Sequence, residues 1–348
     1  MLFLTTDVED YLADGLLHGL RALLGADVVD YPKAERLYVS ATPAQLARVR
    51  GRAFTLYGLL DDVAIDRSHV FARMAAGEFD LVVFSRIWSQ FGLFAELLPR
   101  LGRTAVAVLD GEDSPAPYPY AGRWWREPSL WSVPRAHARF PYFKREWTPE
   151  TLRHRLFKLV PASVASALPL MRNLRRTSFS IPEEKITRVL APRARRFPKH
   201  VVDAELAARI PGASERYAFA SEAAYYEDLQ QAQFGVTTRR AGWDCLRHYE
   251  LAANGCVPLF RDLAKKPATC APHGLVPGLN CLSYSSADEA LELTSRVTAA
   301  EYERLQRGAL EWARANSTVV RAREFLAELG LSTGEPALRA PAAAEAAR

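Results

Sequence analysis

The chain of 348 residues is longer than a single hydrophobic core usually supports, so we expect about two domains. Hydrophobic residues make up 49% of the chain and charged residues 24%, which is ordinary globular usage and excludes a largely disordered protein. The net charge of +5 fits an acidic partner, but it does not choose among nucleic acid, an anionic membrane and a phosphorylated metabolite.

Short apolar strands alternate with helices in the first half of the chain. The expected strands are residues 2–6, 27–32, 52–57, 80–85 and 104–110. The expected helices are residues 11–24, where leucines recur at helical spacing, and 91–101. This alternation predicts a doubly wound α/β domain with a parallel sheet.

A proline- and aromatic-rich stretch, residues 114–148, follows the last of these strands. It contains too many tryptophans and tyrosines for a disordered linker, so we expect an ordered loop that packs against the sheet. The basic, proline-containing segment 191–200 marks the expected domain junction. We therefore expect an N-terminal domain over residues 1–190, a C-terminal domain over 200–332 and a mobile tail over 333–348.

The second half of the chain resumes the alternation of helices and strands. The expected helices are residues 204–210, 226–233, 244–253, 287–297 and 299–315. The expected strands are residues 217–220, 234–238 and 257–260. A second Rossmann-like unit is therefore expected in this half.

The most informative segment is residues 234–262, in which a strand leads through a basic, glycine-containing turn into a helix. The helix N-terminus then lies at the carboxyl end of the sheet, where backbone N–H groups and the positive end of the helix dipole form an anion site. Arg239, Arg240 and Arg247 add cations that suit a phosphate. Glu250 shares a helix face with Arg247 and offers the acceptor that a ribose needs.

An alternative interpretation of this segment needs no ligand. A strand–helix–strand unit folds without one, Glu250 can pair with Arg247 on the helix surface, and Gly255 can simply end the helix. The spacing of the residues alone favours neither interpretation.

Residues 247–262 combine Arg247-x-x-Glu250 with the small-residue turn Ala253-Asn254-Gly255-Cys256 and then Pro258 and Asp262. This pattern resembles the donor-binding signature of GT-B glycosyltransferases, in particular its exostosin-like form. The loop departs from that signature at Arg239, Arg240 and Trp243, where small residues or proline are commoner.

The resemblance implies roles for several residues of the segment. Glu250 would contact the donor ribose or base, and the loop Thr238–Asp244 would face the diphosphate. The candidate donor-binding residues are therefore Thr238, Arg239, Arg240, Arg247, Glu250 and Gly255.

Two acidic clusters follow strands of the first half. Asp7 and Asp10 follow the first strand, and Asp113 follows strand 104–110. Strand carboxyl ends line the ligand crevice of open α/β sheets, and an acceptor hydroxyl needs a general base there. We take these three carboxylates as the candidate catalytic residues, with helix capping and turn formation as the alternatives for each.

Three further side chains carry weaker signals. Lys144 and Arg145 follow the aromatic stretch, and they face either a diphosphate or solvent. His248 belongs to the proposed donor helix but points away from the Glu250 face, so we expect a structural role for it.

The resemblance implies two Rossmann-like domains facing a central cleft, the GT-B arrangement. It also implies a hexosyltransferase-type enzyme that moves a sugar from a nucleotide-diphosphate donor to a hydroxyl. The expected partners are the nucleotide sugar and a saccharide or glycolipid acceptor of surface-polysaccharide assembly. No nucleic acid is expected, because outside Arg193–Lys199 the basic residues form no concentrated stripe with interleaved aromatics.

No cofactor beyond the nucleotide sugar is expected, and no metal. The alternatives to a glycosyltransferase are a non-catalytic nucleotide- or sugar-binding protein of the same fold and a nucleotide-sugar epimerase.

The spacing of the cysteines and the hydropathy of the chain indicate the cellular compartment of the protein. The four cysteines contain no C-x-x-C pair, so we expect free thiols rather than a zinc site. No apolar run approaches about 20 residues, and Asp7 comes too early for a secretory signal. We expect a cytoplasmic protein, with contact at the inner face of the membrane as a further option.

Overall fold

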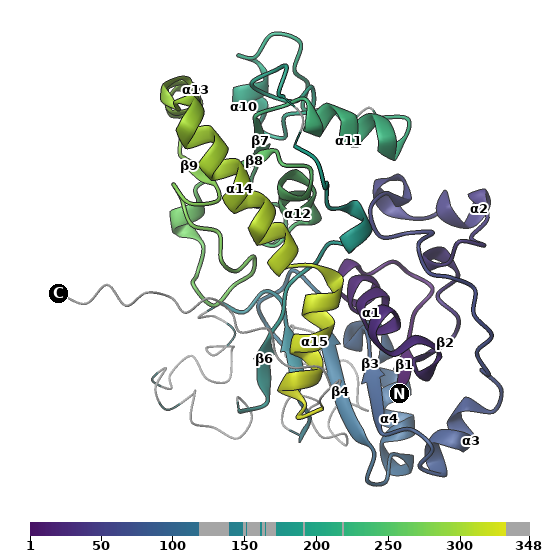
Figure 1. The fold of residues 1–348 in the computed structure, drawn as a ribbon. Helices are drawn as coiled ribbons and strands as arrows, with labels where there is room; N and C mark the ends of the chain where they lie inside the picture. Colours follow the sequence, from purple (N-terminus) through teal and green to yellow (C-terminus); the bar gives the residue numbers. More distant parts are fainter. Residues whose placement is uncertain are drawn as a thin grey trace.

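The fold is built on two parallel β-sheets, one in each half of the chain (Figure 1). The computed structural model describes residues 1–117, 139–148, 151, 161, 164, 172–190, 192–217 and 219–331. The expected tail at 333–348 and most of the expected aromatic loop at 114–148 lie outside the described residues.

The N-terminal sheet has six parallel strands within the described residues, in the order β2–β1–β3–β4–β5–β6. Their bounds are Leu2–Leu4 (β1), Val29–Tyr31 (β2), Leu81–Phe84 (β3), Ala105–Asp110 (β4), Tyr142–Lys144 (β5) and Leu174–Arg176 (β6). Leu4 aligns with Tyr31 on one side and with Phe84 on the other. The carboxyl ends of the central strands therefore meet at one edge of the sheet.

The C-terminal sheet is smaller and is also parallel, with the order β7–β8–β9 in the described part of the chain. Its strands are Phe234–Thr237 (β7), Val257–Arg261 (β8) and Leu282–Tyr284 (β9). Helix α12, Leu246–Ala253, connects β7 to β8, as the sequence predicts for the donor segment.

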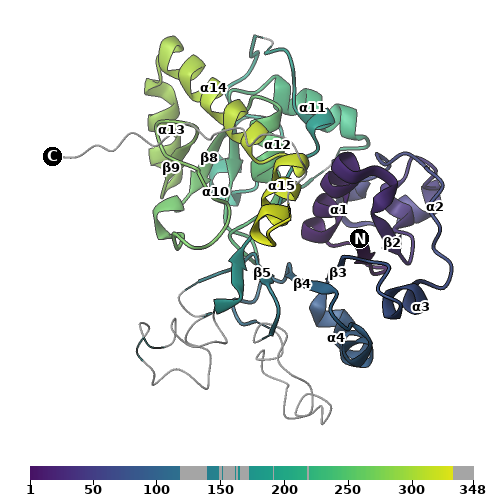
Figure 2. The same cartoon turned by 60° about the horizontal axis from the view of Figure 1, so that its bottom comes forward.

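Helices cover both sheets (Figures 1 and 2). The N-terminal helices are α1 Tyr11–Leu24, α2 Pro43–Leu46, α3 Val70–Ala75 and α4 Ile87–Leu97. The later helices, besides α12, are α10 Ala204–Ala207, α11 Glu222–Gln230, α13 Ala287–Arg296, α14 Ala299–Ala315 and α15 Thr318–Glu328.

Side chains of the N-terminal sheet alternate between two hydrophobic layers. Phe3, Val83 and Leu109 pack in the layer that contains α1. Leu4 and Phe84 pack in the layer that contains α4. Successive residues of a strand point to opposite faces, so each short strand contributes to both layers.

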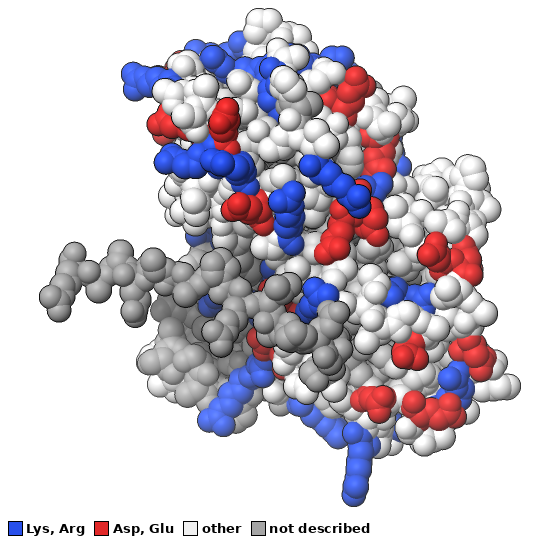
Figure 3. Space-filling model, viewed as in Figure 1, with Lys and Arg blue, Asp and Glu red and all other residues white. Residues whose placement is uncertain are grey.

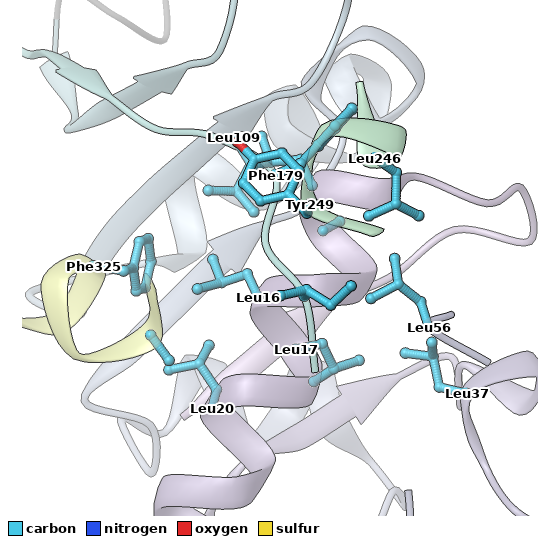
Figure 4. Close-up of a cluster of buried hydrophobic side chains, with 14 of the residues drawn as sticks. Leu16, Leu17, Leu20, Leu37, Leu56, Leu109, Phe179, Leu246, Tyr249 and Phe325 are labelled. Atoms are coloured by element: carbon cyan, nitrogen blue, oxygen red, sulfur yellow. The ribbon is translucent and has the colours of Figure 1, made fainter. Parts of the chain in front are cut away.

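The layer that contains α1 continues into the C-terminal domain (Figure 4). Leu16 of α1, Leu246 and Tyr249 of α12, and Phe325 of α15 belong to the same buried cluster. The two domains therefore share one contiguous hydrophobic core, in addition to their polar contacts.

Helix α15 packs beside α1, although the range 200–332 groups it with the C-terminal domain (Figures 1 and 2). By its packing it completes the N-terminal domain. The chain crosses between the domains at Ile181 and returns near Ser317. The two crossings are hydrogen-bonded, because Ile181 N donates to Asn316 O at 3.2 Å and Thr318 N donates to Ile181 O at 2.9 Å.

Residues 52–57 form no strand, so this expectation is wrong. Arg50–Ala53 form a 3₁₀ turn instead, and Thr55 has a φ of 75°. The backbone N–H of Thr55 donates to Glu222 of the C-terminal domain at 2.6 Å. This segment therefore contacts the C-terminal domain and does not pair with a strand of the sheet.

Candidate functional site

A cavity of about 670 Å³ opens between the two domains. Its N-terminal wall comes from the loops after β1 and β4 and from the end of β5. Its C-terminal wall comes from the loop after β7, the start of α12 and the segment 200–217. Both sheets therefore present the carboxyl ends of their strands to the cavity, which is where open α/β sheets bind ligands.

Most of the predicted site residues meet in this cavity. Those that line it are Asp10, Asp113, Thr238, Arg240, Arg247 and Glu250. The two aspartates come from the N-terminal wall and the other four from the C-terminal wall. The cavity thus brings carboxylates of one domain opposite cations of the other.

Three predicted residues are not part of the described cavity lining. Asp7 is exposed in the turn after β1. The Arg239 guanidinium lies over the Trp243 ring, 5.2 Å from its centroid. Gly255 ends α12 with a φ of 64°, and its carbonyl accepts a hydrogen bond from Arg193 at 2.8 Å. Gly255 therefore has the alternative role of helix termination, which its permissive backbone allows.

The N-terminus of α12 opens into the cavity. Cys245, the N-cap residue, makes no side-chain capping bond, and Cys245, Leu246 and Arg247 all line the cavity. Uncapped N–H groups and the positive end of the helix dipole attract anions. This end of α12 is therefore suited to a phosphate, as the sequence predicts.

Arg247 adds a full positive charge beside that helix end. Its burial would lower its pKa, but Tyr225, Cys245 and Glu250 raise the pKa overall, so the guanidinium stays charged. Within the described part of the chain, Arg247 forms no ion pair. The surface pair with Glu250 that the alternative interpretation requires is thus not formed. A charged donor without a carboxylate partner is suited to an anionic or carbonyl-bearing ligand.

Glu250 is buried and joins the two domains. Its Oε1 accepts from Thr55 Oγ1 at 2.6 Å, and its Oε2 accepts from Tyr225 OH at 2.8 Å. Burial raises the pKa of Glu250, although these two bonds and the charge of Arg247 oppose the shift. Each carboxylate oxygen retains a lone pair that a sugar hydroxyl can use.

Asp10 caps a helix and also lies in the cavity, so its position is compatible with both alternatives that the sequence leaves open. It caps α1, because Oδ1 accepts from Leu12 N at 3.0 Å and Ala13 N at 3.1 Å, and it also lines the cavity. Burial raises the pKa of Asp10 to about 6, and the Ala13 bond and Arg86 oppose that shift. A carboxylate with a pKa near neutrality is a competent general base.

Arg145 and Glu146 tie the N-terminal domain to the turn before α12. Arg145 Nη1 donates to Asp244 O at 2.9 Å, and Asp244 N donates to Glu146 Oε1 at 3.1 Å. Arg145 also binds Asp113. Burial would lower the pKa of Arg145, but these carboxylates raise it overall. Because Asp113 is engaged by Arg145, Asp10 is the better-placed base.

Lys144 faces neither a diphosphate nor solvent, the two positions that the sequence allows for it. It is fully buried in β5 and forms an ion pair with Asp110 at 3.0 Å. Its ammonium therefore stabilises the sheet and reaches neither solvent nor a diphosphate.

His248 has the structural role that we expect from the sequence. Its Nδ1 lies 2.8 Å from Thr237 Oγ1, and its Nε2 lies 2.9 Å from Trp243 O. Burial lowers the pKa of His248 to about 4, so the ring is neutral at physiological pH. It holds the turn before α12 against β7.

Several residues of the site carry no functional signal in the sequence. Thr55, Tyr225, Tyr217 and His200 reach the site through contacts between segments far apart in the chain. Asp244 belongs to an expected helix, 244–253, whereas in the structure it precedes α12 and binds both domains. Spacing along one segment cannot reveal such contacts.

The described residues contain neither a cluster of metal ligands nor a membrane-spanning helix. No group of three His, Cys, Asp or Glu side chains there is arranged to hold a metal ion. No helix in the same residues has the length and apolar character to cross a membrane.

Comparison with solved structures identifies the fold, although no protein-family model and no curated protein matches the sequence. The Anabaena protein HepE (Alr3699) in complex with UDP-glucose matches with a TM-score of 0.52 and 9% identity, covering 94% of this chain and 98% of that chain. The same protein in complex with UDP matches with a TM-score of 0.53 and 9% identity, covering 94% and 99%.

A glycosyltransferase from Rickettsia africae ESF-5 has a TM-score of 0.50 and 8% identity, covering 94% of this chain and 96% of that chain. These matches confirm the expected fold class: the chain has two Rossmann-like domains in the GT-B arrangement. At such low identity they establish the fold alone.

Proposed function

We propose that the chain is a glycosyltransferase that moves a sugar from a nucleotide-diphosphate donor to a hydroxyl acceptor. One observation carries the proposal: in the interdomain cavity, the cationic N-terminus of α12 and the carboxylate of Asp10 line the same space. The fold that the chain shares with HepE, which was solved with UDP-glucose, supports a uridine nucleotide as the first donor to test.

In the proposed reaction, Asp10 accepts the proton of the acceptor hydroxyl, and the oxygen of that hydroxyl attacks the anomeric carbon of the donor sugar. The bond from that carbon to the diphosphate breaks, and the diphosphate leaves with an additional negative charge. The N–H groups of α12, with Arg247 and Arg240, stabilise that charge. The carboxylate of Glu250 accepts hydrogen bonds from hydroxyl groups of the donor.

We also propose a saccharide or glycolipid acceptor, as in surface-polysaccharide assembly. The net charge of +5 supports an acidic acceptor or an anionic lipid surface. On the face shown in Figure 3, basic and acidic side chains are interspersed, which is unlike the continuous basic stripe of a nucleic-acid binder.

Calorimetric titration of UDP tests the donor site. Arg247→Ala should weaken UDP binding by about tenfold or more, because it removes a charge-assisted donor beside the N-terminus of α12. Arg239→Ala is the matched control, because Arg239 lies in the loop that precedes α12 but packs on Trp243. It should bind UDP within about threefold of the wild type.

Turnover of UDP-sugars is the second part of the test. Transfer to added saccharides, with release of UDP, is the expected result. Failure of the wild type to bind any nucleoside diphosphate would refute the proposal. Binding without transfer to any acceptor would favour a binding protein, and conversion of the donor sugar alone would favour an epimerase.

A further inference from the structure

The carboxylate of Asp10 is enclosed by neighbouring loops of the N-terminal sheet. Asp10 follows β1, Arg86 follows β3 and Gly111 follows β4. These three strands are adjacent in the sheet, so the residues that follow them meet at its carboxyl edge. All three residues line the interdomain cavity. The proposed base therefore has neighbours from two other loops in the same cavity wall.

Gly111 lies directly against the carboxylate. A Cβ at this position would lie 2.8 Å from Asp10 Oδ1 and 3.1 Å from Oδ2. The φ of Gly111 is not positive, so its backbone would accept another residue, and it is the nearness of Asp10 that excludes a side chain. Arg145 holds this loop in place, because its Nε and Nη2 donate to Gly111 O at 3.1 and 2.9 Å. The loop after β4 thus leaves room for the Asp10 carboxylate only because residue 111 has no Cβ.

The guanidinium of Arg86 lies beside the other carboxylate oxygen. Its Nε is 3.9 Å from Asp10 Oδ2, and its Nη2 donates to Glu112 Oε1 at 3.1 Å. The backbone N–H of Arg86 donates to Gln90 Oε1 at 3.1 Å, so the residue is held at both ends. A separation of 3.9 Å is too long for a hydrogen bond but short for two charges. Arg86 therefore presents a positive charge to Oδ2 without occupying its lone pairs.

Capping of α1 does not require this enclosure. Both capping bonds end at Oδ1 of Asp10, and within the described residues no hydrogen bond ends at Oδ2. An N-cap aspartate needs only one of its oxygens for this role. The contacts of Arg86 and Gly111 therefore go beyond what the cap needs.

We infer that Arg86 and Gly111 are positioning residues for the proposed base, Asp10. The loop at Gly111 fixes where the carboxylate lies, and the charge of Arg86 favours the ionised form that accepts a proton. A base has to lie within hydrogen-bond reach of the acceptor hydroxyl, so a shift of about 1 Å is costly. This inference rests on the proposed function and extends it to two residues that act through Asp10.

Charged groups from several elements face Asp10. They are Asp14 of α1, Arg36 of the turn after β2, Arg86 before α4 and Arg145 after β5. Asp14 and Arg36 form an ion pair at 2.6 Å, so their charges largely cancel. Arg145 also bonds to the turn before α12. Arg86 is therefore the cation whose removal tests the effect of charge without breaking a contact between the domains.

Arg86→Gln tests the role of the charge. Burial raises the pKa of Asp10 to about 6, and Arg86 is one of the groups that oppose this shift. Because the base is active when it is ionised, loss of the charge should move the acid limb of kcat to higher pH by about 0.5–1 unit. Arg86→Lys keeps a positive charge and should keep that limb within about 0.3 unit of the wild type. An unshifted limb in Arg86→Gln, or equal shifts in the two variants, would contradict the inference.

Gly111→Ala tests the position of the carboxylate. The new Cβ meets the end of the Asp10 side chain, which can move without disrupting the fold, so UDP affinity should stay within about threefold of the wild type. The displaced base should lower kcat by about 10²-fold. Gly92→Ala is the matched control, because a Cβ there meets nothing within 4 Å, and it should keep the wild-type kcat. A wild-type kcat in Gly111→Ala would overturn the inference.

Further measurements separate these effects from a loss of folding and from failure of the proposed function. Melting temperatures show which variants are folded, and if Gly111→Ala is not, the pH profile of Arg86→Gln decides alone. Loss of UDP affinity in Arg86→Gln would place Arg86 in the donor site and overturn the inference. Sugar transfer by the wild type, with both variants unchanged, would overturn the inference and leave the proposed function intact. A wild type that transfers no sugar to any acceptor would refute both.

Discussion

The carboxylate of Asp10 accepts both of its helix-capping bonds at Oδ1. Its other oxygen, Oδ2, lies 3.9 Å from Arg86 Nε, which is a loose contact. Oδ2 therefore keeps lone pairs for a substrate proton while Oδ1 holds the start of α1. Capping of α1 therefore does not compete with the proposed catalytic role of this residue.

Replacement of Asp10 by Asn should separate these two roles. The amide oxygen can still cap α1, but it cannot take a proton, so kcat should fall by about 10²–10⁴-fold. UDP affinity should stay within about threefold of the wild type. Asp7→Asn, in the exposed turn, is the control and should keep wild-type kcat. A kcat of Asp10→Asn close to that of the wild type would exclude Asp10 as the base.

The pH profile of the wild type should reflect the same group. The pKa of Asp10 is raised to about 6, and its active form is the ionised one. The rate should therefore decline as the pH falls through about 6, with loss of this acid limb in Asp10→Asn.

His248 should make the protein sensitive to acid. Its folded pKa is about 4, below the unfolded value of 6.5, so the neutral ring favours folding above pH 6.5 and that stability is lost as the pH falls. Between about pH 7.5 and 4.5 the loss is about 2–3 kcal/mol. Asp10 and Asp244 have raised pKa values and act in the opposite direction. In denaturant titrations the contribution of the two aspartates is common to the wild type and to His248→Gln. On going from pH 7.5 to 4.5, the free energy of unfolding of the variant should therefore change more favourably than that of the wild type, by about 2–3 kcal/mol.

The expected helices and strands are confirmed where their patterns are long or strongly apolar. Helix α1 spans residues 11–24 as expected, and strands β3, β4, β7 and β8 lie in the expected segments. The expected helix 91–101 begins earlier, at Ile87, and ends at Leu97. Residues 217 and 219 belong to no strand.

The strands β5, β6 and β9 and the helix α15 could not be predicted. β5, β6 and β9 are too short to show a period, and they form because their neighbours in the sheet are already in place. Helix α12 and the basic loop before it were predictable because they are local in sequence. The hydrogen bonds from Thr55 to Glu250 and from Arg145 to Asp244 could not be predicted, because they depend on tertiary packing.

Two glycines on helices give a matched test of the contact between α1 and α15. A Cβ at Gly19 would lie 1.9 Å from Thr318 O, whereas a Cβ at Gly92 of α4 meets nothing within 4 Å. Gly19→Ala should lower the free energy of unfolding by about 1–3 kcal/mol through overpacking. Gly92→Ala should raise it by up to about 1 kcal/mol through helix propensity. Similar effects of the two substitutions in denaturant titrations would contradict the close approach of α15.

At the scale of the whole molecule, the shared core determines what can fold alone. Residues 1–190 lack α12, α14 and α15, all of which contribute to the layer around α1. We expect this fragment to unfold without a cooperative transition, whereas residues 1–331 should unfold cooperatively. Near-UV circular dichroism, recorded during heating of the fragment and of residues 1–331, measures the two unfolding transitions. A sharp transition of the fragment would show that its core is complete without the later helices.

The return of α15 to α1 also has a consequence during synthesis. A ribosome makes α1 early, but it must translate as far as Phe325 before the partner of α1 becomes available. The nascent N-terminal domain therefore exposes an apolar face throughout the translation of the C-terminal domain, and chaperones that bind such faces have that whole interval in which to act. The first domain to be translated is among the last parts of the molecule to finish folding.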